Sequence, residues 1–266
     1  MKRWLSHSVF RIYAVFAVAY LLLPVGYTLA FSFNNGGRSN LVWHGFTFDA
    51  WTHLCDAPGV CESVQNSLLV GVLSTLIATV LGTMIAFALG RYLFVGRSFT
   101  NLLIFLPMAT PEVVLGSSLL ALFLNLGGGL LGFPGVLLAH VMFCISFVVV
   151  TVKARVATLD PKLEEAARDL YANELQTFWK VTFPLVLPGI ASAALLAFAL
   201  SFDDFIITYF NAGSNFQTFP VFVWTSNQRG IPPQANVIAS LMFFVALAAV
   251  IIAQVNSARK AKALAK

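Results

Sequence analysis

The chain has 266 residues, of which 59% are hydrophobic and only 10% are charged, and its mean hydropathy is +0.84. Because soluble domains carry about 25% charged residues, this composition excludes an ordinary soluble protein and indicates a membrane protein. The formal net charge of +5 would suggest nucleic-acid binding only in a soluble chain, so we expect no nucleic-acid partner.

Six apolar windows come close to the length of about 20 residues that a helix needs to cross a bilayer. They cover residues 11–33, 65–90, 101–126, 133–152, 186–210 and 235–256. Their continuous apolar character argues against a membrane β-barrel, in which apolar and polar residues alternate. The first window is too long for a signal peptide and lacks a clear cleavage site, so we expect it to be retained. The sequence therefore predicts an all-α, polytopic membrane protein with six transmembrane helices.

The basic residues predict the orientation of these helices. If the N-terminus lies in the cytoplasm, fourteen of the sixteen lysines and arginines are cytoplasmic, and only Arg38 and Arg229 are external. Such an asymmetry is typical of inner-membrane proteins. We therefore expect both termini to be cytoplasmic, with a basic tail at residues 257–266.

The longest external loop, residues 34–64, contains an amphipathic stretch with Trp51 that we expect at the membrane surface. Cys55 and Cys61 in the same loop could form a disulfide in the oxidising exterior or remain free thiols. Cys144 lies one helical turn after His140 in the fourth window. Since two ligands are too few for a zinc site, we interpret this pair as packing residues and expect no metal.

The second and fifth windows carry a small residue at every fourth position. Such stripes allow helix backbones to approach closely and predict packing faces, within a bundle or in a dimer. The residues are Ala78, Gly82, Ala86 and Gly90 in the second window, and Gly189, Ala193, Ala197 and Ser201 in the fifth.

Three of the eleven acidic residues, Glu112, Asp203 and Asp204, lie inside apolar windows, where no lysine or arginine lies deep enough to neutralise them. Because an intramembrane carboxylate is costly, such residues usually face the bundle interior or a water-filled cavity. They are candidates for contact with a cationic ligand along a pathway, or they are protonated and hydrogen-bonded within the bundle. Pro111 is predicted to break the third helix beside Glu112.

The segment between the fourth and fifth windows is predicted to form two short amphipathic helices. Asp160 and Pro161 suit the start of the first helix. Its apolar stripe consists of Leu163, Ala166, Ala167 and Leu170. Asn173 and Gln176 form a capping-box pattern at the start of the second helix.

We expect Pro184 to end the second helix and Pro188 to open the fifth transmembrane helix, with residues 211–234 forming the last external loop. Helices as short as these two are marginal alone in water, so their apolar sides need a partner protein or the membrane surface.

This segment resembles a known family. Glu165 to Leu170, with the sequence EAARDL, and the downstream VTFP at Val181 to Pro184 resemble the EAA loop of ABC importer permeases. The resemblance implies that residues 160–184 form a coupling loop that docks in a groove of a cytoplasmic ATPase. The docking residues would be Glu165, Ala166, Ala167, Asp169, Leu170, Tyr171 and Pro184.

Tyr171 departs from the family pattern, which usually has glycine at this position. A bulky residue with positive φ costs about 1 kcal/mol or more, so we expect the turn to shift to Asn173.

Other stretches resemble the spermidine/putrescine branch of these permeases, over roughly residues 63–255. They are residues 139–144, 160–161, 200–205 and 230–236. The resemblance implies a type I ABC importer permease fold in a bacterial inner membrane. Its divisions would be an N-terminal helix and loop (1–62), a permease core (63–256) and the tail.

The same resemblance implies several partners. They are a second permease, in a heterodimer in preference to a homodimer, two ATP-binding cassette ATPases and an extracytoplasmic solute-binding protein. No lysine directly follows a glycine, so the chain lacks a P-loop. We therefore expect a transport subunit without enzymatic activity or cofactor, with ATP and Mg²⁺ used by the partner ATPase.

Alternative functions remain open. One is a permease of a related importer for another small solute, such as an opine, iron, thiamine or an amino-acid-like compound. Another is an ion-coupled secondary transporter, although the internal repeats usual in such folds are not evident. A membrane-embedded enzyme would need a nucleophile–base pair or a metal cluster, and the sequence suggests neither.

Overall fold

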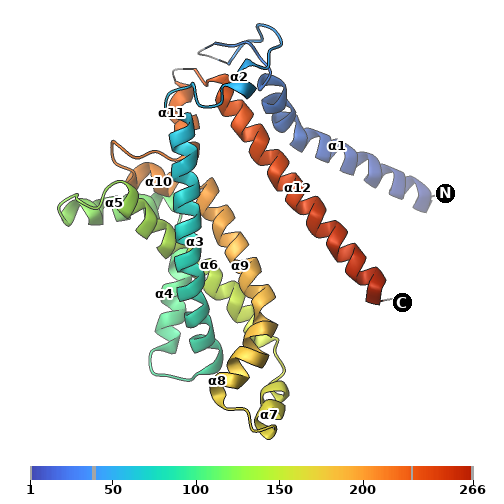
Figure 1. Cartoon of the computed structure of the whole chain (residues 1–266), viewed down its shortest axis with the longest axis vertical. Coiled ribbons are helices and arrows are strands. Elements are labelled where there is room, and N and C mark those ends of the chain that lie inside the picture. Colours follow the sequence, from blue (N-terminus) through green and yellow to red (C-terminus); the bar gives the residue numbers. More distant parts are fainter. Residues whose placement is uncertain (1, 38–39, 229, 265–266) are drawn as a thin grey trace. The chain divides into compact units, whose positions relative to one another are not determined.

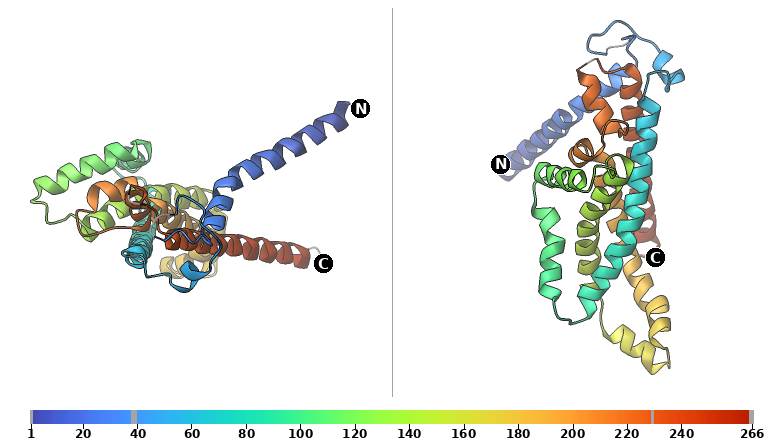
Figure 2. Two further views of the ribbon diagram at one scale, coloured as in Figure 1. Left: turned by 90° about the horizontal axis from the view of Figure 1, so that it is seen from above. Right: turned by 90° about the vertical axis from the view of Figure 1, so that its left-hand side faces the viewer.

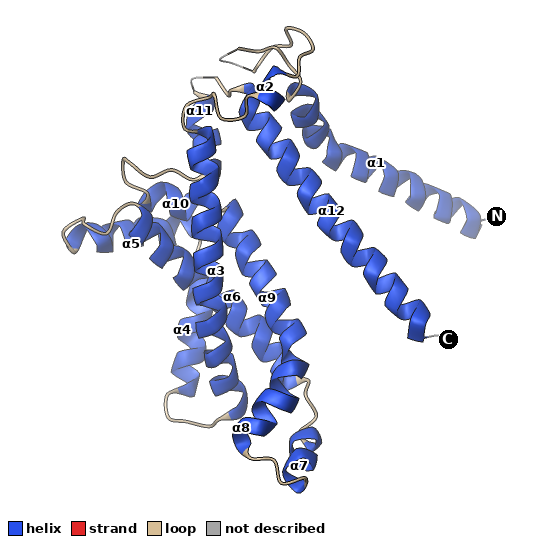
Figure 3. Cartoon of the chain, viewed as in Figure 1, coloured by secondary structure: helices blue, strands red, loops and turns tan. Residues whose placement is uncertain are grey.

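The computed structural model describes residues 2–37, 40–228 and 230–264, so Arg38, Arg229 and Lys266 lie outside the described residues. The described residues form helices and no β-strand, apart from one isolated bridge between Asn34 and Phe46 (Figures 1 and 3). The helices are α1 (Lys2–Phe31), α2 (Asp49–Thr52), α3 (Val60–Arg91), α4 (Arg97–Ala109), α5 (Glu112–Asn125), α6 (Phe133–Ala157), α7 (Lys162–Asp169), α8 (Glu174–Thr177), the π-helix η1 (Phe178–Thr182), α9 (Phe183–Asp203), α10 (Ile206–Asn211), α11 (Phe219–Asn227) and α12 (Pro233–Leu264). The prediction of an all-α fold is confirmed.

Five helical stretches among the described residues are long and apolar enough to cross a membrane. They are Phe10–Phe31, Val60–Arg91, Phe133–Ala157, Glu174–Asp203 and Pro233–Ile252. The remaining window forms two helices, α4 and α5, which are bent by 109° and make a sixth span if the pair is counted as one.

The break between α4 and α5 lies at Pro111, as the sequence predicts, and Figure 2 shows the sharp change of direction. Proline has no amide hydrogen and disfavours helical backbone at the preceding residue. Accordingly, Thr110 has an extended backbone with ψ of 132°. Glu112 follows as the first residue of α5.

The start of α9 differs from the expectation that Pro184 ends one helix and Pro188 opens the next. The chain is helical from Glu174 to Asp203, Pro184 lies in the first turn of α9, and Pro188 lies inside α9. The π-helix η1 ends at Thr182, two residues before Pro184. Because proline clashes with the carbonyl four residues earlier and cannot bond to it, the wider π-helical turn lets the helix continue. A second correction concerns residues 211–234, where α11 lies in a region expected to be a loop.

The chain forms two compact units, residues 1–61 with 222–266, and residues 62–221. In the first unit α12 contacts α1 and α2, and it continues through the predicted tail as far as Leu264. Asn34 organises the loop at residues 34–64, because its side-chain amide donates to Asn40 Oδ1 at 2.6 Å and to the Val42 carbonyl at 2.7 Å. The structure joins Cys55 and Cys61 in a disulfide.

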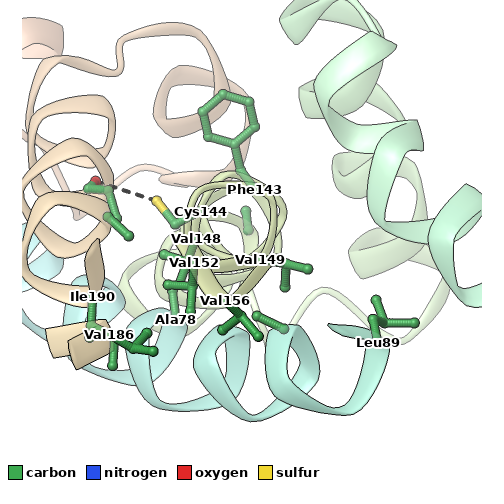
Figure 4. Close-up of a cluster of buried hydrophobic side chains, with 14 of the residues drawn as sticks. Ala78, Leu89, Phe143, Cys144, Val148, Val149, Val152, Val156, Val186 and Ile190 are labelled. Atoms are coloured by element: carbon green, nitrogen blue, oxygen red, sulfur yellow. Dashed lines mark hydrogen bonds between the residues drawn. The ribbon is translucent and has the colours of Figure 1, made fainter. Parts of the chain in front are cut away.

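In the second unit α6 packs against both helices that carry small-residue stripes (Figure 4). A Cβ atom at Gly82 of α3 would lie 2.7 Å from Val148 Cγ1, and one at Gly189 of α9 would lie 2.6 Å from Arg155 Cγ. Ala78, Ala86, Ala193 and Ala197 are fully buried. Both stripes are therefore packing faces within this chain.

Candidate functional site

Helix α7 begins as the sequence predicts. The Asp160 carboxylate accepts a hydrogen bond from the Lys162 amide at 3.0 Å. Pro161 follows Asp160 directly, where its missing amide leaves no unpaired donor. Asp160 and Pro161 thus define where this short helix starts.

The end of α7 is a Schellman motif with tyrosine at the left-handed position. The Ala172 amide bonds to the Ala167 carbonyl at 3.1 Å and the Tyr171 amide to the Arg168 carbonyl at 2.9 Å. Tyr171 has φ of 63° and is the only described residue other than glycine with positive φ. The expected shift of this turn to Asn173 is wrong, because Asn173 is extended, with φ of −74°.

The reason lies in the role of Asn173 at the start of α8. Its side chain accepts from the Gln176 amide at 2.8 Å, and the Gln176 side chain accepts from the Asn173 amide at 3.1 Å. This is the predicted capping box, and a residue that caps a helix N-terminus in this way needs an extended backbone. The left-handed turn must therefore occur earlier, at Tyr171.

The loop formed by α7 and α8, here taken as residues 160–184, leaves most of its large apolar side chains exposed. Leu170 is 82% exposed and Tyr171 97% exposed, and Leu163, Leu175 and Trp179 are exposed as well. Glu165, Ala166, Asp169 and Pro184 are also exposed. On α7 only Glu164 and Ala167 are not exposed, so these two residues face the rest of the chain.

Glu164 is held by two elements outside α7. Its carboxylate pairs with the Arg91 guanidinium at 2.7 Å and accepts a hydrogen bond from the Thr182 hydroxyl at 2.6 Å. Burial raises the pKa of the Glu164 carboxyl, but hydrogen bonds from Thr182 and Arg91 and the charges of Arg91 and Arg168 outweigh that effect. The pKa of Glu164 therefore lies below its ordinary value, and the group is ionised at neutral pH.

A second polar cluster lies inside the bundle of α3, α6, α9 and α10. His140 of α6 is 1% exposed, and its Nδ1 lies 2.7 Å from Ser201 Oγ, while its Nε2 lies 2.9 Å from Thr208 Oγ1. Ser201 Oγ is in turn 2.8 Å from Ser74 Oγ of α3. A chain of hydrogen bonds thus links four helices.

Asp204 belongs to this cluster. Its side chain is only 4% exposed, and its Oδ2 lies 3.3 Å from His140 Nε2. The amides of Ile207 and Thr208 and the Thr208 hydroxyl donate to its two oxygens at 3.2, 2.8 and 2.9 Å. Asp204 therefore satisfies the free amides at the start of α10, just after α9 ends.

The three acidic residues inside the apolar windows have different surroundings. Asp203 and Glu112 are exposed on this chain and make no ion pair within the part of the chain that the structure describes, whereas the side chain of Asp204 is buried. The structure does not gather the three into one cluster. Among the described residues, no group of three or more metal-ligating side chains lies close enough to hold an ion. Whether these carboxylates contact a ligand stays a prediction.

Sequence reasoning missed two features of this site. In the sequence, Glu164 resembles any solvent-exposed charged residue on a helix. Only the fold shows that Arg91 and Thr182 bind its carboxylate. The sequence predicts His140 as a packing residue, whereas its ring contacts Ser201 of α9 and Thr208 of α10, and Ser201 in turn contacts Ser74 of α3. The spacing of Ser201, Asp204 and Thr208 was the one available signal for the second feature.

Comparison with known proteins gives a family match. The model of the family described as "Binding-protein-dependent transport system inner membrane component" matches residues 78–262. The spermidine/putrescine transport system permease protein PotC of Escherichia coli (strain K12) is 35% identical over 244 residues, covering 92% of each chain. The putrescine transport system permease protein PotI of the same strain is 33% identical over 230 residues, covering 84% of this chain and 81% of the relative.

Among solved structures, the chain is similar to part of a bacterial ABC transporter involved in the import of the acidic polysaccharide alginate. The TM-score is 0.70 at 20% identity, covering 94% of this chain and 95% of the other. An inward-facing MetNI methionine ABC transporter matches with a TM-score of 0.57 at 15% identity, covering 72% of this chain and 90% of the other. These similarities support the type I importer permease fold.

Proposed function

This chain belongs to the family of inner membrane components of binding-protein-dependent transport systems, and we propose that it forms part of the pathway through which an ABC importer takes up polyamines. The chain is a multi-pass permease subunit of such an importer. The observation that carries the choice of cargo is the 35% identity to a spermidine/putrescine permease over 92% of both chains.

The uncovered apolar side of the loop formed by α7 and α8 supports the proposed ATPase partner. Leu170 and Tyr171 lie in the turn between α7 and α8 with almost no cover from the described part of the chain. The chain has no P-loop of its own, so ATP and Mg²⁺ would be used by two separate ATPase subunits. A second permease, preferably a different chain, and an external binding protein would complete the importer.

One feature supports the proposed cationic cargo, and another supports the proposed orientation. Asp203 and Glu112 are exposed carboxylates without a basic partner among the described residues, and a polyamine could supply the missing positive charge. Asp204 was predicted as a third contact, and its side chain would have to leave its present hydrogen bonds to reach the cargo. The asymmetric distribution of lysine and arginine supports cytoplasmic termini.

The proposed mechanism is alternating access. ATP-driven closure of the two ATPases would move the coupling loops, and the transmembrane helices would then open the cavity towards the external binding protein. Hydrolysis would reset the helices and release the cargo into the cytoplasm. The role of this chain is to form the pathway and to receive the movement.

The test is uptake by the complete importer in proteoliposomes. We expect uptake of labelled putrescine or spermidine that requires ATP, the binding protein and this chain. Uptake driven by an ion gradient without ATP would contradict the importer assignment for this chain. ATP-dependent uptake of another solute, together with a binding protein that ignores polyamines, would contradict the cargo alone.

A further inference from the structure

The side of α7 that faces its own chain carries a single charged group. Every described α7 residue except Glu164 and Ala167 is exposed, and Ala167 is a small apolar contact. Glu164 and Ala167 are three residues apart, so they share one side of the helix. The polar link between the docking helix and the rest of the chain therefore depends on Glu164.

The two oxygens of this carboxylate bind two different transmembrane segments. Oε2 pairs with Nη1 of Arg91, the last residue of α3, at 2.7 Å. Oε1 accepts from Oγ1 of Thr182, the last residue of η1, at 2.6 Å. The side chains of Arg91 and Glu164 are 27% and 21% exposed, so solvent screens this pair less than it screens a surface pair.

Both segments lead directly into the packed bundle. Helix α3 lies against α6 through Gly82 and Val148, and η1 continues into α9, whose small residues also pack against α6. Such tightly packed helices transmit displacement because little empty space absorbs it. The π-helical form of η1 also marks a place where helix geometry can change, and π-helical turns are frequent at functional sites.

We infer that Glu164 is a positioning residue that transmits the movement of α7 to α3 and to the η1–α9 helix during transport. This inference rests on the proposed function, since it assumes that an ATPase moves α7. It assigns separate tasks to two adjacent residues. Glu165 faces the ATPase, whereas Glu164 faces the helices of its own chain.

The test compares Glu164→Ala, Arg91→Ala and Thr182→Val with wild type in the complete importer. We expect each variant to assemble with the ATPases and to have a lower coupling ratio, which is the uptake per ATP hydrolysed. For Glu164→Ala this ratio should fall by about 10-fold, which lies within the usual range of coupling between two sites. Thr182→Val keeps the size of the side chain and should give the smallest fall. The double variant Arg91→Glu with Glu164→Arg should restore the ratio, because the guanidinium introduced on α7 can bind both the carboxylate introduced at the end of α3 and the Thr182 hydroxyl.

The matched comparison is Glu165→Ala, which should weaken ATPase binding in a pull-down, whereas Glu164→Ala should bind the ATPases as wild type does. Loss of ATPase binding in Glu164→Ala would overturn the inference, because Glu164 would then be a docking residue. An unchanged ratio in Glu164→Ala, or no rescue by the exchanged pair in a complex of normal thermal stability, would also overturn it. If the wild-type chain binds no ATPase at all, the proposed function fails instead.

Discussion

The core around α6 and the loop formed by α7 and α8 differ in where their contacts are completed. In the core, small residues, valines and the His140 cluster find their partners within the chain, and Ala78, Val148 and Ala197 are fully buried. In the loop, Asn173 and Gln176 cap the start of α8 locally, but Leu170, Tyr171 and Leu175 remain exposed. The difference teaches that changes in the core should affect stability, while changes in the loop should affect assembly.

The same comparison separates the carboxylates of the chain. Asp204 accepts hydrogen bonds at both oxygens inside the core, and Glu164 does so at the boundary between the loop and the core. Asp203 and Glu112 have no such partners among the described residues. Only carboxylates such as these two can bind a cation without first breaking hydrogen bonds that stabilise the fold.

The largest expected effect is overpacking of the core. Gly82→Leu places a side chain where even a Cβ atom would lie 2.7 Å from Val148, so we expect a loss of about 3 kcal/mol or more of stability. The measurements are the amount of protein in the membrane and thermal unfolding in detergent. Gly26→Leu in α1 is the control, because an added Cβ atom there would meet no side chain or other segment within 4 Å. Equal stability of the two variants would show that the close contact between α3 and α6 is not real.

The second prediction compares Asp204→Asn with Asp203→Asn. The amides of Ile207 and Thr208 donate to the Asp204 carboxylate, and the NH₂ group of an asparagine could not accept from them. We therefore expect the free energy of unfolding to fall by about 1–3 kcal/mol. Asp203→Asn should keep wild-type stability and weaken polyamine uptake by the complete importer. If Asp204→Asn is as stable as wild type, the hydrogen bonds of Asp204 contribute little to stability, and its carboxylate would be available to contact the cargo.

The sequence predicted features that depend on neighbouring residues along the chain. The helix start at Asp160, the capping box at Asn173 and the break at Pro111 follow from local backbone chemistry, and the structure has all three. The small-residue stripes also predicted packing faces, because their period is that of a helix side. The sequence alone could not predict which helix these stripes pack against.

Where the prediction failed, two local preferences competed. Tyrosine is unfavourable at positive φ, but Asn173 caps α8 and needs an extended backbone for that role. The left-handed turn therefore lies at Tyr171. Pro184 usually ends a helix, but the π-helix before it lets the helix continue. The partners of Glu164 and His140 were out of reach, since Arg91 and Ser201 are separated from them by 73 and 61 residues.

The third prediction uses the strained tyrosine to separate stability from assembly. Tyr171→Gly removes the strain of a left-handed tyrosine and should stabilise the isolated chain by about 1 kcal/mol, whereas Tyr171→Ala keeps most of that strain. Both variants lose an exposed ring and should bind the ATPase more weakly in a pull-down. Wild-type ATPase binding by Tyr171→Ala would show that the ring lies outside the interface.

The smallest expected effect concerns the charge of Glu164, which joins the loop to the core. Its pKa in the folded chain is lowered, so its ionised form contributes stability above the ordinary glutamate pKa of about 4.3, and this contribution is lost as the pH falls through the lower folded value. We therefore expect Glu164→Gln to be less stable than wild type by about 1 kcal/mol at pH 7, with the difference shrinking below pH of about 4. Thermal unfolding in detergent across this range measures it, with Glu165→Gln as the control for loss of an exposed carboxylate. A difference that persists unchanged at low pH would mean that the shape of the side chain, and not its charge, holds α7 against α3 and η1.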